Sequence, residues 1–260
     1  MKPIALTIAG SDPSGGAGLQ ADLKTFHQFG LYGMSVVTLL TVQNTRGVRD
    51  VRNLDTRFVI AQLENLLEDL PPGGAKTGAL GTAETIEAIA SKAKGFSFPL
   101  VVDPVMVSKH GASLVDPEGA EAFRRYLLRH CYLVTPNRME ATALSEWEVK
   151  DRKSMREAAR AIAALGPRAV LLKGGHLEEE DATDLLYFEK EFLEFPARRI
   201  DTPNTHGTGC TYSAAIASGL ARGKSLPESV GAAKRYLTRA IETNPGLGHG
   251  HGPVNHHAEV

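Results

Sequence analysis

The sequence is poor in cysteine, in long apolar runs and in charge of one sign. Only Cys131 and Cys210 occur among its 260 residues, too few for a disulfide scaffold. No apolar run approaches the roughly 20 residues that a membrane-spanning helix needs. The formal net charge of −1 supplies neither a basic field for nucleic acid nor a polybasic patch for a membrane surface. We therefore expect no nucleic-acid partner and no membrane partner.

The N-terminus, residues 1–16, could be mistaken for an export signal. Its apolar stretch is short and gives way to a polar glycine loop where a cleavage site would stand. We therefore expect a cytoplasmic protein. The hydrophobic content of 42% and the charged content of 23% are ordinary for a globular chain, and no repeat or linker divides it. We predict a single domain over residues 1–260.

Apolar strand-like runs alternate with helical patterns from end to end. Helical spacing occurs at 19–29 and 56–70, and the runs that predict strands lie at 3–9, 33–42, 100–103, 132–135 and 169–173. Gly47–Leu54 indicates an extra strand, and Asp181–Arg199 indicates a hairpin that turns at Glu189–Glu191. The pattern predicts an α/β fold with a central mostly parallel sheet between helices and a small antiparallel flap. In such sheets ligands bind beyond the carboxyl ends of the strands.

Several helix ends are marked by capping residues. Asp116 before Pro117 is typical of an N-cap followed by a proline in the first turn. Ser154 and Ser225 each stand three residues before a glutamate, which predicts a capping box at each. Gly166, followed by proline, is expected to close the helix that begins near Ser154.

A glycine loop, Gly10–Gly18, follows the first predicted strand. Gly16, Gly18 and Ala21 match the dinucleotide fingerprint, but the acidic residue that it needs about 20 positions later is missing. No P-loop pattern occurs either; residues 74–77 resemble only its last part. Two readings remain open: a loop that brings backbone N–H groups to a ligand, or a tight strand-to-helix turn.

The turn Gly207–Cys210 opens a helix rich in small residues. Glycines at 207 and 209 remove side chains, so an anion can approach the amides at the helix N-terminus. Cys210 falls in the first turn, where we expect the helix field to favour its thiolate, which could accept a proton from an attacking hydroxyl. The alternative is a glycine-capped helix with a small apolar cysteine, the role expected for Cys131.

Long motifs then resemble a known family. They are the strings at 9–22 and 204–210, supported by shorter ones at 42–47, 103–106, 135–137, 173–176 and 250–256. In this order the chain resembles the hydroxymethylpyrimidine/phosphomethylpyrimidine kinases of thiamin biosynthesis from about residue 4 to 256. The resemblance implies a ribokinase-like three-layer sandwich. It also implies ATP-dependent phosphorylation of 4-amino-5-hydroxymethyl-2-methylpyrimidine and of its monophosphate.

The resemblance implies roles for the glycine turn. Gly207, Thr208 and Gly209 would form the anion hole. Cys210 would be the catalytic residue, at a position where most sugar-kinase relatives carry aspartate. This cysteine is the main reason to expect a pyrimidine substrate and not a sugar.

The remaining site residues are also carried over by resemblance. Gln43 would bind the pyrimidine edge, with Asp22, Gly10 and Ala17 completing the substrate pocket. ATP and its phosphates would meet Lys173, Asp103, Asn204 and Thr205. Asn137 and Glu140 would organise Mg²⁺ through water.

For several of these residues a purely structural interpretation also stays open. Asn137 and Glu140 also match a capping box. Asp22 could be a solvated carboxylate on a helix face. A lysine at a strand end, such as Lys173, is usually solvated.

Rival functions remain as well. A pyridoxal kinase of the same superfamily is the nearest alternative, and a non-catalytic binding protein on this scaffold is the next. The cofactors expected are ATP and Mg²⁺, and the family suggests a homodimer. His249, His251, His256 and His257 lack the spacing of a metal site, so we assign no metal there.

Overall fold

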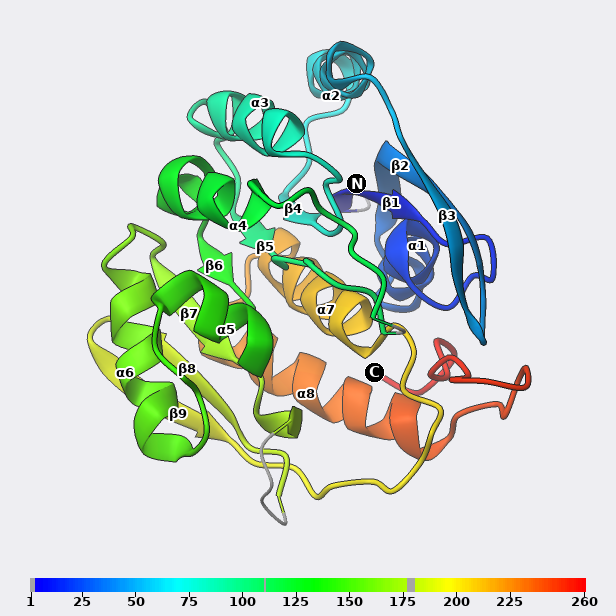
Figure 1. The fold of residues 1–260 in the computed structure, drawn as a ribbon, viewed down its shortest axis with the longest axis vertical. Coiled ribbons are helices and arrows are strands. Elements are labelled where there is room, and N and C mark those ends of the chain that lie inside the picture. The colour runs from blue at the N-terminus through cyan, green and yellow to red at the C-terminus, as the bar shows by residue number, and fades with distance from the viewer. Residues whose placement is uncertain (1–2, 110, 177–180) are drawn as a thin grey trace.

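The computed structural model describes residues 3–109, 111–176 and 181–260. In this part of the chain nine strands form one sheet in the order β3-β2-β1-β4-β5-β6-β7-β8-β9 (Figure 1). Their bounds are β1 Ile4–Ser11, β2 Tyr32–Asn44, β3 Gly47–Asn53, β4 Gly74–Thr77, β5 Leu100–Val102, β6 Leu133–Val134, β7 Ala169–Leu172, β8 Asp184–Phe188 and β9 Glu191–Phe195.

The centre of the sheet is parallel and its edges are antiparallel. β2, β1, β4, β5, β6 and β7 pair in parallel, whereas β3 pairs antiparallel with β2, and β8 and β9 continue antiparallel from β7. The predicted α/β fold with a mostly parallel sheet is confirmed. The hairpin β8–β9 turns at Glu189 and Lys190, whose φ angles of 51° and 66° are left-handed.

Helices cover both faces of the sheet, which makes three layers (Figure 1). The helical segments are α1 Gly18–Gln28, α2 Thr56–Asp69, α3 Ala83–Ala93, α4 Gly119–Ala122 with η1 Phe123–Leu127 and η2 Leu128–His130, α5 Arg138–Ser145, α6 Arg152–Ala163, η3 Gly174–His176, α7 Thr208–Ala221 and α8 Leu226–Glu242. α1, α7 and α8 pack on one face, and α2 to α6 pack on the other. No helix in the described part of the chain combines the length and apolar content needed to cross a bilayer.

The two faces of the sheet divide the apolar core by strict alternation. Val101 packs toward α7 and α8, while its neighbour Val102 packs toward the opposite helices. Leu171 and Leu172 divide in the same way. A strand buried on both faces has no polar alternation, and this is why these strands appear in the sequence as continuous apolar runs.

Two of the predicted helix starts are wrong. Ser154 is not the N-cap of α6 but its third residue; Asp151 is the N-cap, and its side chain accepts a hydrogen bond from the backbone N–H of Ser154. α4 begins at Gly119, two residues beyond Pro117. The carboxylate of Asp116 instead accepts the backbone N–H of Ala83 at the start of α3. The capping box at Ser225 is confirmed.

Helix α7 lies against the sheet with almost no exposed surface. Every residue from Thr211 to Leu220 is buried. Small side chains allow this close approach; a Cβ at Gly74 of β4 would lie 3.1 Å from the carbonyl oxygen of Ala217, and Gly219 is packed against Ser229 of α8. The tight packing fixes where the N-terminus of α7 stands relative to the strand ends.

Candidate active site

The glycine loop before α1 and the glycine turn before α7 are in contact at one end of the sheet. Gly207 has a φ of 79°, and a Cβ there would overlap the carbonyl oxygen of Gly16. Gly18 has a φ of 56°, and a Cβ there would overlap the carbonyl oxygen of Gly10. Both the left-handed backbone and the lack of space require glycine. The loop before α1 and the turn before α7 therefore form one unit.

The N-terminus of α7 opens toward the ends of β5 and β7. Gly207 is its N-cap and supplies no side-chain hydrogen bond, so first-turn amides are available to a ligand. A Cβ at Gly209 would lie 3.4 Å from Oδ2 of Asp103 and 3.5 Å from Nζ of Lys173. The Cα of Gly209, which carries no side chain, thus faces the carboxylate of Asp103 and the ammonium of Lys173 across a short gap. This arrangement suits an anion that is held by amides and a lysine.

The polar residues after β5, β6 and β7 come together, as their strand-end positions predict. Nζ of Lys173 donates to Oδ1 of Asp103 at 3.0 Å, and Oγ1 of Thr135 donates to the same oxygen at 3.3 Å. Burial would lower the pKa of Lys173, but the carboxylates of Asp103 and Glu140 outweigh it, so the pKa is raised and the lysine stays charged. Lys173 is therefore not a solvated lysine, which was the structural alternative for a strand-end position.

Asn137 and Glu140 form the capping box of α5 that the sequence predicts. The side chain of Asn137 accepts the N–H of Glu140 at 3.0 Å, and Oε2 of Glu140 accepts the N–H of Asn137 at 2.7 Å. The same oxygen lies 3.8 Å from Nζ of Lys173. Burial raises the pKa of Glu140 to about 7, against the opposing charge of Lys173. The cap places this carboxylate beside the candidate phosphate site, and its water-mediated Mg²⁺ role stays a prediction.

The prediction of a favoured Cys210 thiolate is wrong. Burial raises the pKa of the thiol to about 12, although the charge of Lys76 opposes the rise. Part of the Cys210 side chain is exposed, but desolvation dominates and the thiol rests protonated at neutral pH. Cys131 is buried, as expected for a structural cysteine.

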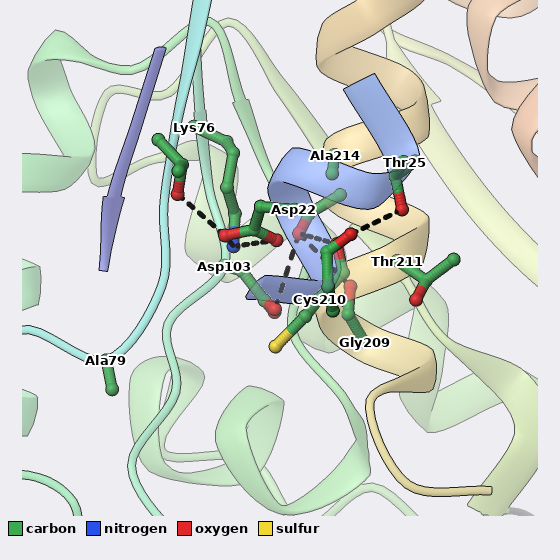
Figure 2. A network of polar contacts seen from close by, with 12 residues as sticks. Asp22, Thr25, Lys76, Ala79, Asp103, Gly209, Cys210, Thr211 and Ala214 are labelled. Atoms are coloured by element: carbon green, nitrogen blue, oxygen red, sulfur yellow. Dashed lines mark hydrogen bonds and ion pairs between the residues drawn. The ribbon is translucent and has the colours of Figure 1, made fainter. Parts of the chain in front are cut away.

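A buried ion pair stands next to Cys210 (Figure 2). Nζ of Lys76 on β4 lies 3.0 Å from Oδ2 and 3.1 Å from Oδ1 of Asp22 on α1, and Oγ1 of Thr7 donates to the same carboxylate at 2.6 Å. Neither charged side chain has exposed surface. Asp22 is thus not a solvated carboxylate on a helix face, and its contact with substrate stays a prediction. Lys76 was missed because Gly74–Thr77 is a four-residue strand with no periodic pattern.

A second network surrounds Gln43, near the end of β2. Nε2 of His206 lies 2.8 Å from Oδ2 of Asp12 and 3.2 Å from the amide nitrogen of Gln43. His206 and Asp12 are buried, whereas Gln43 is half-buried. Ala17 joins the network because its N–H donates to Oδ2 of Asp12 at 2.9 Å. Sequence reasoning missed His206 and Asp12, although both belong to the two motifs that carry the family resemblance.

The side chain of Asn204 holds the C-terminal segment. Its Oδ1 accepts the N–H of Gly252 at 3.1 Å, and its Nδ2 donates to Oδ1 of Asn244 at 2.7 Å. His206 exchanges backbone hydrogen bonds with Gly252 and Val254. Asn204 thus ties the turn before α7 to the C-terminal segment. Its nucleotide contact, like that of Thr205, stays a prediction.

The C-terminal histidines do not gather around a metal position. Among the residues that the structure describes, no group of three or more histidine, cysteine, aspartate or glutamate side chains could hold an ion. Nε2 of His256 lies 3.2 Å from Oγ1 of Thr211, and Nδ1 of His251 lies 3.0 Å from the carbonyl oxygen of Pro203. These side chains tie the C-terminal segment to the fold.

Comparison with known proteins gives consistent matches. A family model described as phosphomethylpyrimidine kinase matches residues 12–255. The chain is 51% identical over 252 residues to the thiamine biosynthesis bifunctional protein ThiED of Geobacter sulfurreducens, with 96% of this chain but only 51% of that protein covered. It is 48% identical over 259 residues to the hydroxymethylpyrimidine/phosphomethylpyrimidine kinase of Rhizobium meliloti, with 98% and 97% covered.

Solved structures of two activities resemble the chain. An ADP complex of Bacillus subtilis pyridoxal kinase matches with a TM-score of 0.91 and 40% identity over 99% of this chain and 98% of that one. A phosphomethylpyrimidine kinase from Clostridium difficile matches with a TM-score of 0.82 and 43% identity over 92% and 100%. The fold is thus shared with kinases of two heterocyclic substrates.

Proposed function

The chain belongs to the phosphomethylpyrimidine kinase family, and from this premise and the geometry of the Gly207–Cys210 turn we propose a two-step kinase. It transfers the γ-phosphoryl group of ATP to the hydroxymethyl oxygen of 4-amino-5-hydroxymethyl-2-methylpyrimidine, and a second one to the phosphate of the product. The observation that carries the proposal is the open N-terminus of α7, which faces Lys173 and Asp103 across the bare Cα of Gly209.

In the transfer, a substrate oxygen attacks the γ-phosphorus while the bond from that phosphorus to the β-γ bridging oxygen breaks. First-turn amides of α7, at Gly209 and Cys210, and the ammonium of Lys173 stabilise the charge on the transferring group. Asp103 orients Lys173 through their 3.0 Å hydrogen bond. Because the transition state is loose, charge stabilisation and positioning contribute more than a base does.

Cys210 can accept the proton of the attacking hydroxyl only as a thiolate, so its own proton must first leave to solvent. A thiol with a pKa of about 12 is a poor source of thiolate in the resting enzyme. The hydroxyl proton becomes acidic only as the oxygen bonds to phosphorus, so it can leave late in the transfer. No covalent enzyme intermediate is needed.

Mg²⁺ fits the side chains at this edge of the sheet only as a partly hydrated ion. The carboxylates of Asp103 and Glu140 are hard oxygen donors, as Mg²⁺ prefers, and the described residues contain no complete ligand cage. Asn137 keeps Glu140 in place through the capping box. When bound with ATP, the ion would neutralise the oxygens of the β- and γ-phosphates.

The substrate ring lies beside Gln43 in this proposal. Its amide offers a donor and an acceptor in one plane, which complements an aminopyrimidine edge. Gly10 and Ala17 form the adjoining wall, and Asp22, which pairs with Lys76, completes the pocket. Asn204 and Thr205 flank the phosphates. The enzyme acts as a single domain and as a cytoplasmic homodimer.

Pyridoxal phosphorylation is the second candidate function. The Bacillus subtilis pyridoxal kinase structure matches this chain with a TM-score of 0.91 over 98% of its length. Pyridoxal is also a planar heterocycle that carries a hydroxymethyl group. Gln43 and Cys210 favour the pyrimidine.

The test measures ADP release with purified protein, Mg²⁺ and ATP. The hydroxymethylpyrimidine, its monophosphate, pyridoxal and ribose are offered in parallel, and Cys210→Ala and Gln43→Ala are measured beside the native protein. We expect turnover of both pyrimidines, and loss of most activity in folded Cys210→Ala.

Turnover of pyridoxal or ribose alone would overturn the pyrimidine assignment, whereas the proposed anion hole at Gly207–Cys210 would still hold. Absence of turnover with every acceptor would favour the non-catalytic binding protein.

A further inference from the structure

Asp12 determines where the hydrogen of the His206 ring lies. Its Oδ1 accepts the N–H of Ser14 at 2.9 Å and the hydroxyl of Ser14 at 2.7 Å, and its Oδ2 accepts the N–H of Ala17 at 2.9 Å. Although burial raises its pKa, the hydrogen bonds from His206 and Ser14 lower it to about 2. A carboxylate that is ionised and surrounded by donors can only accept. Nε2 of His206, 2.8 Å away, therefore carries a hydrogen and donates it to Asp12.

This hydrogen determines which end of the Gln43 amide faces the ring. Nε2 of His206 cannot accept an N–H from Gln43 while it bears a hydrogen itself. The two ends of an amide have the same shape, so half a turn exchanges them without moving other atoms. That single hydrogen points mainly to Asp12, so the 3.2 Å contact is the weaker arm of a shared hydrogen bond. The amide oxygen of Gln43 can accept this arm, whereas an N–H of Gln43 in its place would oppose the hydrogen.

Thr41 leads to the same orientation from the other side. Its single hydroxyl hydrogen goes to the carbonyl oxygen of Ser11 at 3.0 Å, because a carbonyl can only accept. The hydroxyl oxygen, 3.3 Å from the far end of the Gln43 amide, is then an acceptor and needs an N–H opposite it. Two independent neighbours thus agree on one amide orientation.

The His206 ring is buried and closely packed on the side of Gly16. A Cβ at Gly16 would lie 2.6 Å from Cδ2 of His206 and 3.1 Å from Cβ of Pro253, so the ring is enclosed on this side. The amide of Gln43 has two donors and two lone pairs on its oxygen. After the bonds to His206 and Thr41, one N–H and one lone pair are left for a ligand.

We infer that Asp12 and His206 are positioning residues that hold the Gln43 amide in one orientation and so determine the donor–acceptor order of the substrate edge. The inference rests on the proposed function. A 4-aminopyrimidine presents an amino donor beside a ring-nitrogen acceptor. The 4-oxo analogue presents the opposite order, a carbonyl acceptor beside a ring N–H donor. A fixed amide pairs with one order only, whereas a freely turning amide pairs with both.

The experiment compares kcat/KM for the hydroxymethylpyrimidine and for its 4-oxo analogue. We expect native protein to prefer the 4-amino substrate by about 100-fold or more, since the wrong order leaves polar groups unpaired. His206→Phe fills a similar volume without the hydrogen, and we expect the preference to fall by about tenfold. Thr41→Val should lower the preference less.

A matched control separates specificity from structural damage. Asn204→Ala loosens the same turn without touching Gln43, so it should lower kcat/KM for both substrates and leave their ratio unchanged. Native protein that turns over both pyrimidines equally would overturn the inference while the proposed function stands. An active His206→Phe variant with the native ratio of kcat/KM for the 4-amino and 4-oxo substrates would also overturn the inference. If His206→Phe does not fold, unchanged ratios in both Asp12→Asn and Thr41→Val overturn it. Turnover of neither pyrimidine overturns the proposed function and the inference together.

Discussion

Nζ of Lys76 lies 3.0 Å from Oδ2 of Asp22 in the interior of the protein, where neither side chain has exposed surface. The pair joins β4 to α1 beside Cys210 (Figure 2). Burial would lower the pKa of Lys76, but Asp22 and the neighbouring acidic groups raise it. Burial also raises the pKa of Asp22, and the charge of Lys76 and the hydrogen bond from Thr7 oppose this rise. The carboxylate therefore depends on Lys76 to stay ionised.

Replacing Lys76 by methionine should destabilise the fold, because it leaves the Asp22 carboxylate buried without its counter-charge. We expect the free energy of unfolding in urea to fall by about 3 kcal/mol. The double variant Lys76→Met/Asp22→Asn should recover part of this loss, since no charge is then left buried. A single variant that loses under about 1 kcal/mol would show that the pair contributes little.

Asp12 should make the stability depend on pH in the acid range. Its pKa is about 2 in the folded protein against 3.8 for an ordinary aspartate. A depressed pKa contributes stability above the unfolded value, and this contribution is lost as the pH falls through the folded value. The shift corresponds to about 2 kcal/mol.

The measurement compares native protein with Asp12→Asn by denaturant unfolding between pH 6 and about pH 3. The native protein should be more stable by at least about 2 kcal/mol at pH 6, and the difference should shrink below about pH 4. A difference that is constant across this range would contradict the assigned role of the carboxylate.

The strand-end residues could be predicted from the sequence, but their buried partners could not. Asp103 and Lys173 follow apolar runs, and parallel strands end at one edge, so their proximity follows from the fold class. Lys76 sits inside a strand of four residues, and its partner Asp22 is 54 positions away. Nothing local in the sequence indicates that such a lysine is buried.

Cys210 was predicted in the right place but with the wrong pKa. The sequence reveals the helix start and its glycines, which favour a thiolate. It does not reveal how much surrounding protein excludes water from the thiol, and this desolvation decides the direction of the shift. The Asp12–His206 contact likewise joins residues 194 positions apart. Such contacts arise only when the two motifs fold against each other.

The raised pKa of Cys210 predicts slow alkylation near neutral pH. Iodoacetamide reacts with thiolate, and a thiol with a pKa of about 12 is almost wholly protonated at pH 7.5. The alkylation rate should rise about tenfold per pH unit up to at least pH 9.5. The measurement uses mass spectrometry of Cys131→Ala protein, in which Cys210 is the only cysteine. A rate that levels off below pH 8 would show that the thiolate is favoured after all.

Alanine at the two glycines of the α7 turn should separate folding from catalysis. At Gly207 the φ of 79° and the overlap with Gly16 leave no room, so Gly207→Ala should lower the free energy of unfolding by more than about 2 kcal/mol. At Gly209 a Cβ meets Asp103 and Lys173 only at 3.4 Å and 3.5 Å, which is ordinary contact distance. Gly209→Ala should therefore fold with nearly native stability.

The methyl group of Gly209→Ala nevertheless occupies the gap between the amides of α7 and Lys173. A phosphoryl group could then not reach both, so kcat should fall by about 100-fold. Thermal unfolding and ADP release measured on the same preparations test the pair. Near-native turnover by Gly209→Ala would show that phosphate does not approach this turn, whereas equal destabilisation by both variants would show that the two glycines have the same structural role.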